Sequence, residues 1–352
     1  MNLKEAVNPY KEKIDITLKK FLDNKLNFNN KYLNNKYNNL KSYLMNGKKI
    51  RPLLCVLAYK SVNGKKDEIY DAAISLELFH NSTLVHDDIM DEDDKRRNLE
   101  TIHVSDSKLY NKKDGKAKLF SSSKVRFGVS SAIITGDYCF TLGQIAIIES
   151  KFSDDLKLKI LKVYNKVYQA VCIGQDLDIF MENNFEYSEE DYLEMIRNKT
   201  GNLIRESVEI GLILGNAKDT DKNILLRYAE LIGLAFQIKD DLMSISKESD
   251  KGHDFGEDIK QNKTTLILIK ALELSNNKDK KELLDLLNKE KDINDINRII
   301  EIFYKTGAVD YCNKVCEKNI KEAKLILNKG NFDKDIKEIF IALADFFKDR
   351  RV

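Results

Sequence analysis

Residues 72–90, AAISLELFHNSTLVHDDIM, are apolar around most of the circumference of the helix that they would form. Such a helix must be covered on most of its sides, so it belongs inside a bundle of helices. Apolar residues also recur at helical spacing in residues 163–180, 225–243, 264–274 and 292–307. Alternating strand patterns with hairpin turns are missing, and only two prolines are present to interrupt helices. We therefore predict an all-α protein with one helical domain over residues 1–352.

Two segments are predicted to lie outside the helices. Residues 105–131 are rich in Lys and Ser and have weak periodicity, which indicates a loop insertion at the surface. Residues 275–280, SNNKDK, indicate a second and shorter linker.

The overall composition restricts the classes of function. Charged residues make up 33% of the chain, yet the formal net charge is only +2, whereas a dedicated nucleic-acid binder usually has a basic excess. The N-terminal residues lack the apolar core of a signal peptide, and no uncharged apolar run is long enough to span a bilayer. Cys312 and Cys316 are expected to be buried free thiols rather than metal ligands. These features favour a cytoplasmic protein with no membrane span and no nucleic-acid partner.

Six acidic residues crowd into LVHDDIMDEDDKRR at residues 84–97, directly before Lys95, Arg96 and Arg97. On a helix, Asp87 and Asp91 would lie one turn apart, where like charges cost roughly 0.2–0.5 kcal/mol per pair. Either solvent screens this cost, or a cation binds there.

A second acidic pair, Asp240 and Asp241, follows Gln237 near the end of a predicted apolar helix. Burying unpaired carboxylates is expensive, so this pair also needs a compensating charge. If the two acidic clusters lay on facing helices, they would form an all-oxygen cage that suits Mg²⁺. Mg²⁺ commonly binds phosphates through a few carboxylates, so the cage predicts a phosphorylated ligand.

Cationic residues that could hold phosphates recur along the chain. They are Lys48 and Arg51 beside Gly47, Arg96 and Arg97 after the first acidic cluster, Lys199 beside Thr200, and Lys263. Each taken alone is better explained as a solvated surface charge. Their joint occurrence with two aspartate clusters is what favours a phosphate site.

Seven motifs stand in one order along the chain: GKKIRP, ELFHNSTLVHDDIMDEDDKRR, ITGDY, IGQDLD, IRNKTG, GLAFQIKDDLM and GEDIKQNKTT. Over roughly residues 40–270 the chain thereby resembles the trans-isoprenyl diphosphate synthases, which include the short-chain farnesyl and geranylgeranyl diphosphate synthases. The resemblance implies a single large helical bundle of the isoprenoid synthase type with a central cavity. It also implies a Mg²⁺-dependent prenyltransferase that acts as a homodimer.

The resemblance implies a role for each matching residue. The metal ligands would be Asp87, Asp88, Asp91, Asp240 and Asp241, and the catalytic residues Asp87, Asp88, Asp91, Arg96, Lys199, Asp240 and Lys263. The allylic diphosphate, or the cation formed from it, would contact Arg96, Lys199, Thr200, Gln237 and Lys263. Isopentenyl diphosphate would bind at Gly47, Lys48, Arg51, His80 and Arg97, and further polar positions in the cleft would be Asp137, Gln175 and Asp178.

The implied reaction condenses isopentenyl diphosphate with an allylic diphosphate such as dimethylallyl, geranyl or farnesyl diphosphate. A helical terpene cyclase also ionises prenyl diphosphates, but it needs no second diphosphate site, which the set around Lys48, Arg51 and His80 provides. A non-catalytic subunit of a heteromeric synthase is the other alternative, and such subunits typically lose an aspartate motif. Glu92, Asp93 and Asp94 are expected to be helix-end or solvent charges rather than ligands.

Three features depart from the family pattern. Ser244 stands where the second motif usually has a third acid, and Gly252–His253 stands where Gly-Lys is usual, with Lys251 as a possible substitute for the lost lysine. The loop at 105–131 is longer than the family usually shows. A tolerated surface insertion explains this loop better than a substrate lid or a partner site does.

Product length would depend on the first bulky side chain upstream of Asp87 on its helix. Ser82 and Thr83 are small, whereas Phe79 lies eight residues before Asp87, about 12 Å along the helix axis. A floor at Phe79 suits a geranylgeranyl product, with farnesyl as the close alternative. Phe79 could equally be an ordinary core residue.

Overall fold

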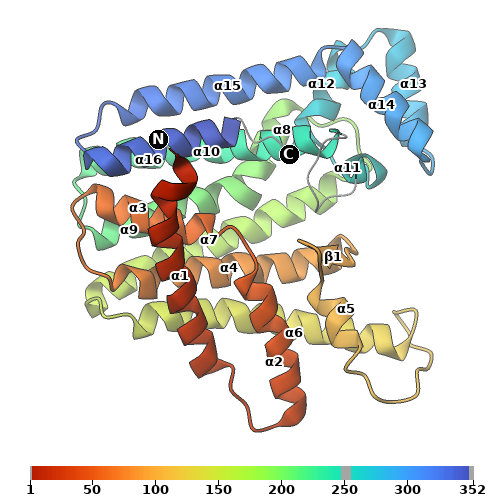
Figure 1. The fold of residues 1–352 in the computed structure, drawn as a ribbon. Helices are drawn as coiled ribbons and strands as arrows, with labels where there is room; N and C mark the ends of the chain where they lie inside the picture. Colours follow the sequence, from red (N-terminus) through yellow and green to blue (C-terminus); the bar gives the residue numbers. More distant parts are fainter. Residues whose placement is uncertain (1, 247–254, 349–352) are drawn as a thin grey trace. The chain divides into compact units, whose positions relative to one another are not determined.

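The structure is a computed structural model that describes residues 2–246 and 255–348, and it confirms the all-α prediction (Figure 1). Its helices are α1 (Leu3–Lys25), α2 (Lys31–Met45), α3 (Ile50–Ser61), α4 (Ile69–Met90), α5 (Ile102–Ser107), α6 (Ser123–Glu149), α7 (Asp154–Met181), α8 (Glu189–Ile196), α9 (Asn202–Leu214), α10 (Asp219–Ser244), α11 (Glu257–Lys260), α12 (Leu266–Leu274), α13 (Asn277–Leu287), α14 (Ile293–Lys305), α15 (Ala308–Leu327) and α16 (Lys334–Lys348). A π-helical turn, η1 (Arg197–Gly201), joins α8 to α9.

The helices form two compact units. The N-terminal unit comprises Asn2–Lys162 and Ile210–Gly215, and the C-terminal unit comprises Val163–Glu209 and the described part of Asn216–Val352. Helices α7 and α9 each contribute to both units. The single domain over residues 1–352 and its central cavity stay predictions.

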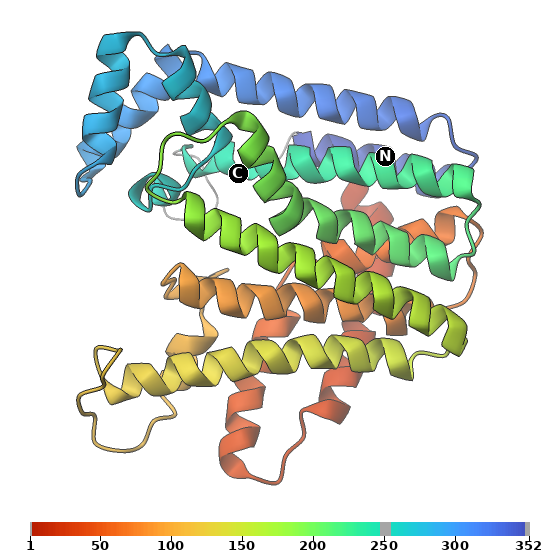
Figure 2. The ribbon, with the colours of Figure 1, turned by 180° about the vertical axis from the view of Figure 1, so that it is seen from behind.

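Helix α4 is the centre of the N-terminal unit, as its apolar circumference predicts. It packs against α1, α3, α5 and α6, and Figures 1 and 2 both show α4 and α6 side by side. Phe79 of α4 is fully buried and meets Phe140 of α6 edge to face, with ring centroids 6.0 Å apart. Burial of this kind stabilises the folded state by about 1.5–3 kcal/mol per large apolar side chain.

In the C-terminal unit, α10 is covered by α15 and α16 and also contacts η1. Tyr228 of α10 is fully buried, packs on Phe340 of α16 and donates a hydrogen bond of 2.6 Å to the Phe340 carbonyl. The helical tail beyond residue 270 thus encloses the helix that carries Asp240 and Asp241.

The predicted loop at 105–131 is wrong at both ends. Residues up to Ser107 belong to α5, and α6 begins at Ser123, so the loop proper covers only residues 108–122. Ser122 caps α6 by accepting a hydrogen bond from Val125 N, and Ser131 donates one of 2.6 Å to the buried Asp106 of α5. The first turns of α6 have weak helical periodicity, so the sequence indicates a loop there. They are helical because packing against α5 stabilises them, and a local pattern does not show that packing.

The linker predicted at 275–280 is also shorter than expected. Helix α13 begins at Asn277, because the Asn276 side chain accepts a hydrogen bond from Asp279 N and caps it.

One hairpin interrupts the helices, although the sequence indicated none. Strands β1 (Lys95–Arg96) and β2 (Leu99–Glu100) are antiparallel, and Arg97 and Asn98 between them both have positive φ. Two residues with positive φ match the tight turns that join short strands. The turn lacks the Asn-Gly or Asp-Gly pair that would have revealed it.

Helix α6 is long and apolar enough to cross a membrane by length and composition alone. Half of its most apolar stretch is buried in the protein, so the core helix of a soluble bundle explains it equally well.

All five cysteines are free thiols, and Cys312 and Cys316 are buried as predicted, while Cys172 is exposed.

Candidate active site

The first acidic cluster lies at the C-terminal end of α4 in the N-terminal unit. Asp87 and Asp88 are in the last turn and Asp91 is the C-cap residue. Carboxylates are unfavourable at this end of a helix, because the helix dipole places partial negative charge there. The location therefore attracts cations.

Asp88 and Asp87 differ in their surroundings. The Asp88 side chain is only 1% exposed; it accepts a hydrogen bond of 2.8 Å from the Tyr43 hydroxyl and another from Arg96 Nε. Burial raises the pKa of Asp88 to about 6, although Arg96 and Tyr43 oppose this rise. The Asp87 side chain is 18% exposed and lies 3.4 Å from Arg96 Nη2. These contacts favour a positioning role for Asp88, whose assignment as a metal ligand stays a prediction.

The hairpin returns Arg96 over the acids that precede it. Arg96 lies on β1, and its guanidinium contacts Asp87, Asp88 and Asp93. Asp93 follows the end of α4 and contacts Arg96, and Glu92 and Asp94 are exposed, which agrees with the expectation of helix-end or solvent charges. The sequence could not reveal this contact, since it depends on the unexpected turn at Arg97 and Asn98.

A cationic group surrounds His80, also in the N-terminal unit. Burial lowers the pKa of His80 well below its ordinary value, and the positive charges of Arg51, Arg97, Arg96 and Lys49 lower it further. His80 is therefore neutral near pH 7. Arg96 and Lys49 also contact carboxylates, so Arg51 and Arg97 are the cations of this group that suit an anion such as diphosphate.

Gly47 allows Arg97 to join this group. Arg97 Nη1 donates to the Asn46 carbonyl, and a Cβ atom at Gly47 would lie only 2.5 Å from that nitrogen. No side chain fits at residue 47 unless Arg97 moves.

The two lysines of GKKIRP have different roles. Lys48 is exposed, as a substrate contact requires. Lys49 is buried and holds the turn between α2 and α3 by donating to the carbonyls of Leu44 (2.9 Å) and Met45 (3.1 Å). Spacing alone could not distinguish the two.

The second acidic cluster lies at the end of α10 in the C-terminal unit. Asp241 is buried; it accepts hydrogen bonds from the Tyr192 hydroxyl (2.6 Å) and from Gln237 Nε2 (3.1 Å). Burial raises the pKa of Asp241 to about 7, and the negative charges of Asp258 and Asp240 raise it further. The inner aspartate of each pair is thus held by a buried tyrosine, Tyr43 or Tyr192.

Sequence reasoning assigned no role to Tyr192 or Asp258. Tyr192 lies on α8, seven residues before Lys199, and no local pattern of the sequence indicates its contact with Asp241. Asp258 lies in GEDIK on α11, and its charge acts on Asp241. An acid close to Asp241 is therefore present even though Ser244 is not one.

Lys199 and Thr200 lie in η1, a type of turn often found at functional sites. Lys199 Nζ pairs with Asp178 of α7, and Thr200 Oγ1 donates to Gln237 Oε1 at 3.0 Å. Gly174 lets α7 approach the η1 backbone, because a Cβ atom there would collide with the backbone of Asn198 and Lys199. The predicted allylic-site residues Thr200 and Gln237 therefore lie in one hydrogen-bonded group with Asp241, while Lys199 next to Thr200 pairs with Asp178 instead.

The remaining predicted positions are less closely connected. Lys263 is placed by its backbone N–H, which donates to the Asp258 carbonyl at 2.9 Å. Gln175 keeps a buried amide nitrogen that finds no hydrogen-bond partner among the described residues, so a ligand oxygen could bind there. Asp137 is 70% exposed and lies 3.6 Å from His86 Nε2. The Ser244 hydroxyl donates to the Asp241 carbonyl, and His253 with its neighbours lies outside the described residues.

No group of three or more acids, histidines or cysteines forms a ready metal site within residues 2–246 and 255–348. The donor chemistry still fits a hard cation, since both clusters offer only carboxylate oxygens.

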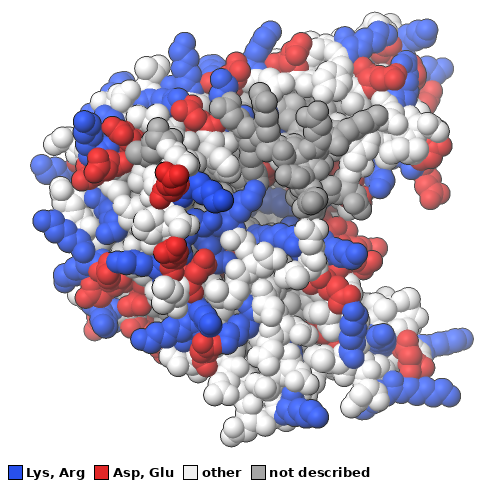
Figure 3. All heavy atoms as spheres, in the orientation of Figure 1, with Lys and Arg blue, Asp and Glu red and all other residues white. Residues whose placement is uncertain are grey.

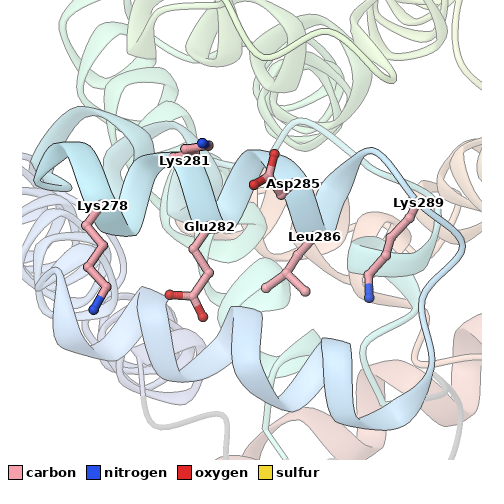
Figure 4. A pocket seen from close by; sticks show the side chains of 6 residues that line it. All are labelled: Lys278, Lys281, Glu282, Asp285, Leu286 and Lys289. Atoms are coloured by element: carbon pink, nitrogen blue, oxygen red, sulfur yellow. The ribbon is translucent and has the colours of Figure 1, made fainter.

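A groove of about 430 Å³ along α13 contains none of the predicted site residues (Figure 4). It is lined by Lys278, Lys281, Glu282, Asp285, Leu286 and Lys289.

Comparisons with known proteins show which family the chain is related to. Residues 34–303 match the polyprenyl synthetase family. The chain belongs to this family. It is 35% identical over 344 residues to a short chain isoprenyl diphosphate synthase of Methanocaldococcus jannaschii, covering 96% of this chain and 94% of that protein. A geranylgeranyl pyrophosphate synthase of Geoglobus acetivorans is 32% identical over 86% of this chain and 87% of its own length.

Solved structures of the family share the fold. Geranylgeranyl pyrophosphate synthetase from Pyrococcus horikoshii superposes with a TM-score of 0.83 at 29% identity, covering 99% of this chain and 98% of that one. Geranylgeranyl pyrophosphate synthase from Corynebacterium glutamicum, in complex with isoprenyl diphosphate and magnesium, gives a TM-score of 0.89 at 25% identity over the whole of both chains. Membership of the family confirms the prediction of a prenyl diphosphate synthase.

Proposed function

We propose that this family member is a Mg²⁺-dependent, short-chain trans-prenyltransferase that condenses isopentenyl diphosphate with allylic diphosphates. The observation that carries the proposal is the set of Arg51 and Arg97 near neutral His80, with Gly47 close against Arg97, in the same unit as the first acidic cluster. A protein that only ionises one prenyl diphosphate has no use for this second anion site.

Geranylgeranyl diphosphate is the proposed main product, with farnesyl diphosphate as the alternative. Relatives from Geoglobus acetivorans and Methanosarcina mazei are named geranylgeranyl synthases, whereas a more distant one from Aeropyrum pernix is a geranylfarnesyl diphosphate synthase. Phe79 is fully buried on α4 two turns before Asp87, where it could end the path of the growing chain.

Mg²⁺ would be held in the N-terminal unit by Asp87 and Asp91 and in the C-terminal unit by Asp240, with Asp88 and Asp241 as further candidates. When bound, it would supply positive charge for the oxygens of the allylic diphosphate. Arg96 is oriented for the same purpose by Asp87, Asp88 and Asp93.

The protein's own groups would act at different atoms of the two substrates. Lys199, oriented by Asp178, would bind the departing diphosphate, and the Thr200–Gln237 pair would present its oxygens to the allylic carbon as positive charge develops there. Lys48, Arg51, Arg97 and neutral His80 would hold isopentenyl diphosphate. The allylic C–O bond breaks, the isopentenyl double bond attacks the allylic carbon, and loss of a proton to the released diphosphate completes one five-carbon addition.

We also propose that the protein is a cytoplasmic homodimer. On α6, Ile133 is 48% exposed and Ile134 is 58% exposed, and a second copy of the chain would cover such an apolar face. Light scattering should give twice the mass of one chain, and replacement of both isoleucines with glutamate should reduce it to that of a monomer.

Incubation of the purified chain with Mg²⁺, labelled isopentenyl diphosphate and each allylic primer tests the proposal. Elongated products, identified by mass, are expected, with the C20 diphosphate dominant. Cyclic hydrocarbons would indicate a cyclase, and no product at all would indicate a non-catalytic subunit. Either result would refute the proposed function.

A further inference from the structure

The connection between α5 and α6 carries a strongly basic surface for which prenyl transfer has no use. Six basic residues, here called the basic loop surface, are all exposed: Lys112, Lys113, Lys116, Lys118, Lys124 and Arg126. None of them forms an ion pair with a carboxylate in the described part of the chain. The loop between α5 and α6 lies at the lower right of Figure 1, and in Figure 3 several blue side chains project from that corner among white atoms and a few red ones.

Asp114, the one acid among residues 108–126, is used within the loop. Its side chain accepts hydrogen bonds from the backbone N–H groups of Gly115 (3.0 Å) and Lys124 (2.9 Å), next to the start of α6. The partial positive charge of that helix end offsets the Asp114 charge. The Lys124 charge also acts on Asp114, so Lys124 is partly compensated, and the other five cations face solvent with little local compensation.

The loop is held in place, so its cations have a defined arrangement. Ser123 N donates to the Gly115 carbonyl at 2.8 Å, which closes residues 115–123 into a turn. At the base of the loop, the Tyr110 and Phe127 rings pack with their centroids 5.6 Å apart. The Phe127 ring also packs against Tyr32 of α2, with the centroids 6.1 Å apart.

An apolar side chain projects from the middle of these cations. Leu119 is 83% exposed, the highest value among the large apolar residues of 2–246 and 255–348, and it directly follows Lys118. Exposing a leucine to water is unfavourable, and binding that buries it recovers this loss. Basic residues around an apolar residue are the combination that binds the interface of an anionic membrane.

We propose that the basic loop surface docks this protein on anionic lipid membranes, with Leu119 entering the headgroup region. A nucleic acid fits less well, because it offers no apolar environment for Leu119 and because the chain as a whole carries only +2. The inference does not rest on the proposed function, since membrane binding needs neither substrate nor turnover. It would place the enzyme where an apolar product can leave into lipid.

Co-sedimentation of the full chain with vesicles tests the proposal. Binding is expected to vesicles of equal parts phosphatidylcholine and phosphatidylglycerol, to be weak with phosphatidylcholine alone, and to fall as salt is added. Each basic residue near an anionic surface strengthens binding about fivefold. The triple variant Lys113→Ser, Lys116→Ser, Lys118→Ser should therefore bind on the order of a hundredfold more weakly, and Leu119→Ser should weaken binding without changing its salt dependence.

A matched control removes the same charge elsewhere. Lys280, Lys318 and Lys321 are exposed on α13 and α15, and their replacement with serine should leave vesicle binding within twofold of the unaltered protein. Equal losses in the two triple variants would overturn the proposal, because they would reflect total charge. So would undiminished binding by the loop variant, or displacement of the protein from vesicles by an RNA oligonucleotide that binds the same lysines.

Discussion

Replacing Tyr192 with phenylalanine tests how the second acidic cluster is held. The change removes only the hydroxyl, which donates a hydrogen bond of 2.6 Å to Asp241, and leaves the buried ring in place. A hydrogen bond to a charged group contributes roughly 1.5–3 kcal/mol, against about 0.5–1.5 kcal/mol for one between neutral groups. Loss of a partner that orients a metal ligand typically lowers metal affinity 10–100-fold.

The expected effect on stability depends on pH. Burial raises the pKa of Asp241 to about 7, whereas the Tyr192 hydrogen bond lowers it. Because the folded state binds this proton more tightly than the unfolded state, the stability contributed by Asp241 is present at low pH and lost as pH rises through 7. At pH 5 the buried Asp241 is neutral, and loss of the Tyr192 hydrogen bond should lower the free energy of unfolding by about 1 kcal/mol. At pH 8 Asp241 is charged, and loss of the same bond should lower it by about 2–3 kcal/mol.

Denaturant unfolding in chelator at several pH values measures this difference, and calorimetric titration of Mg²⁺ in the presence of diphosphate measures affinity. Tyr228→Phe is the matched control, because Tyr228 is a buried tyrosine of the same unit whose hydroxyl donates 2.6 Å to a neutral carbonyl. That variant should lose about 1 kcal/mol at every pH and keep its Mg²⁺ affinity. If the two variants behave alike in both measurements, Tyr192 supports only the fold and the reasoning is refuted.

Four further predictions concern other parts of the chain. Asp87→Ala and Asp91→Ala should each lower turnover on the order of a hundredfold or more without lowering the melting temperature; near-normal rates at saturating Mg²⁺ would remove both from the ligand set. Ser244→Asp should keep or raise the Mg²⁺ affinity measured by titration, since it adds a carboxylate near Asp241, and a marked loss would assign Ser244 another role. Phe79→Ala should lengthen the products seen by mass spectrometry, whereas unchanged products with a loss of about 3–5 kcal/mol in stability would make Phe79 a core residue only. Burial and the neighbouring Glu209 raise the pKa of Glu206, so the free energy of unfolding should fall as pH rises above the ordinary glutamate pKa of 4.5. Glu206→Gln should flatten that fall in denaturant unfolding curves measured against pH, and an unchanged slope would contradict this prediction.

Local pattern was sufficient to predict the all-α class and the helices that carry the site. Helical periodicity depends on which residues are apolar, and burial of α4 follows directly from its apolar circumference. The family motifs likewise predict roles for Asp87, Asp240 and Lys199, because each motif is a short run of chemically distinctive residues.

Other features depended on contacts between residues far apart in the chain, which no local pattern encodes. The hairpin that returns Arg96 to Asp88 has no turn signature, and the first turns of α6 have weak periodicity but pack on α5. Tyr43 lies 45 residues from Asp88 and Tyr192 lies 49 residues from Asp241, so neither pairing could be read from spacing. The sequence by itself therefore determined the helices and the chemical groups they carry. Only the tertiary structure decided which aspartate of each pair is buried, because burial and hydrogen-bond partners come from helices that meet only in the folded chain.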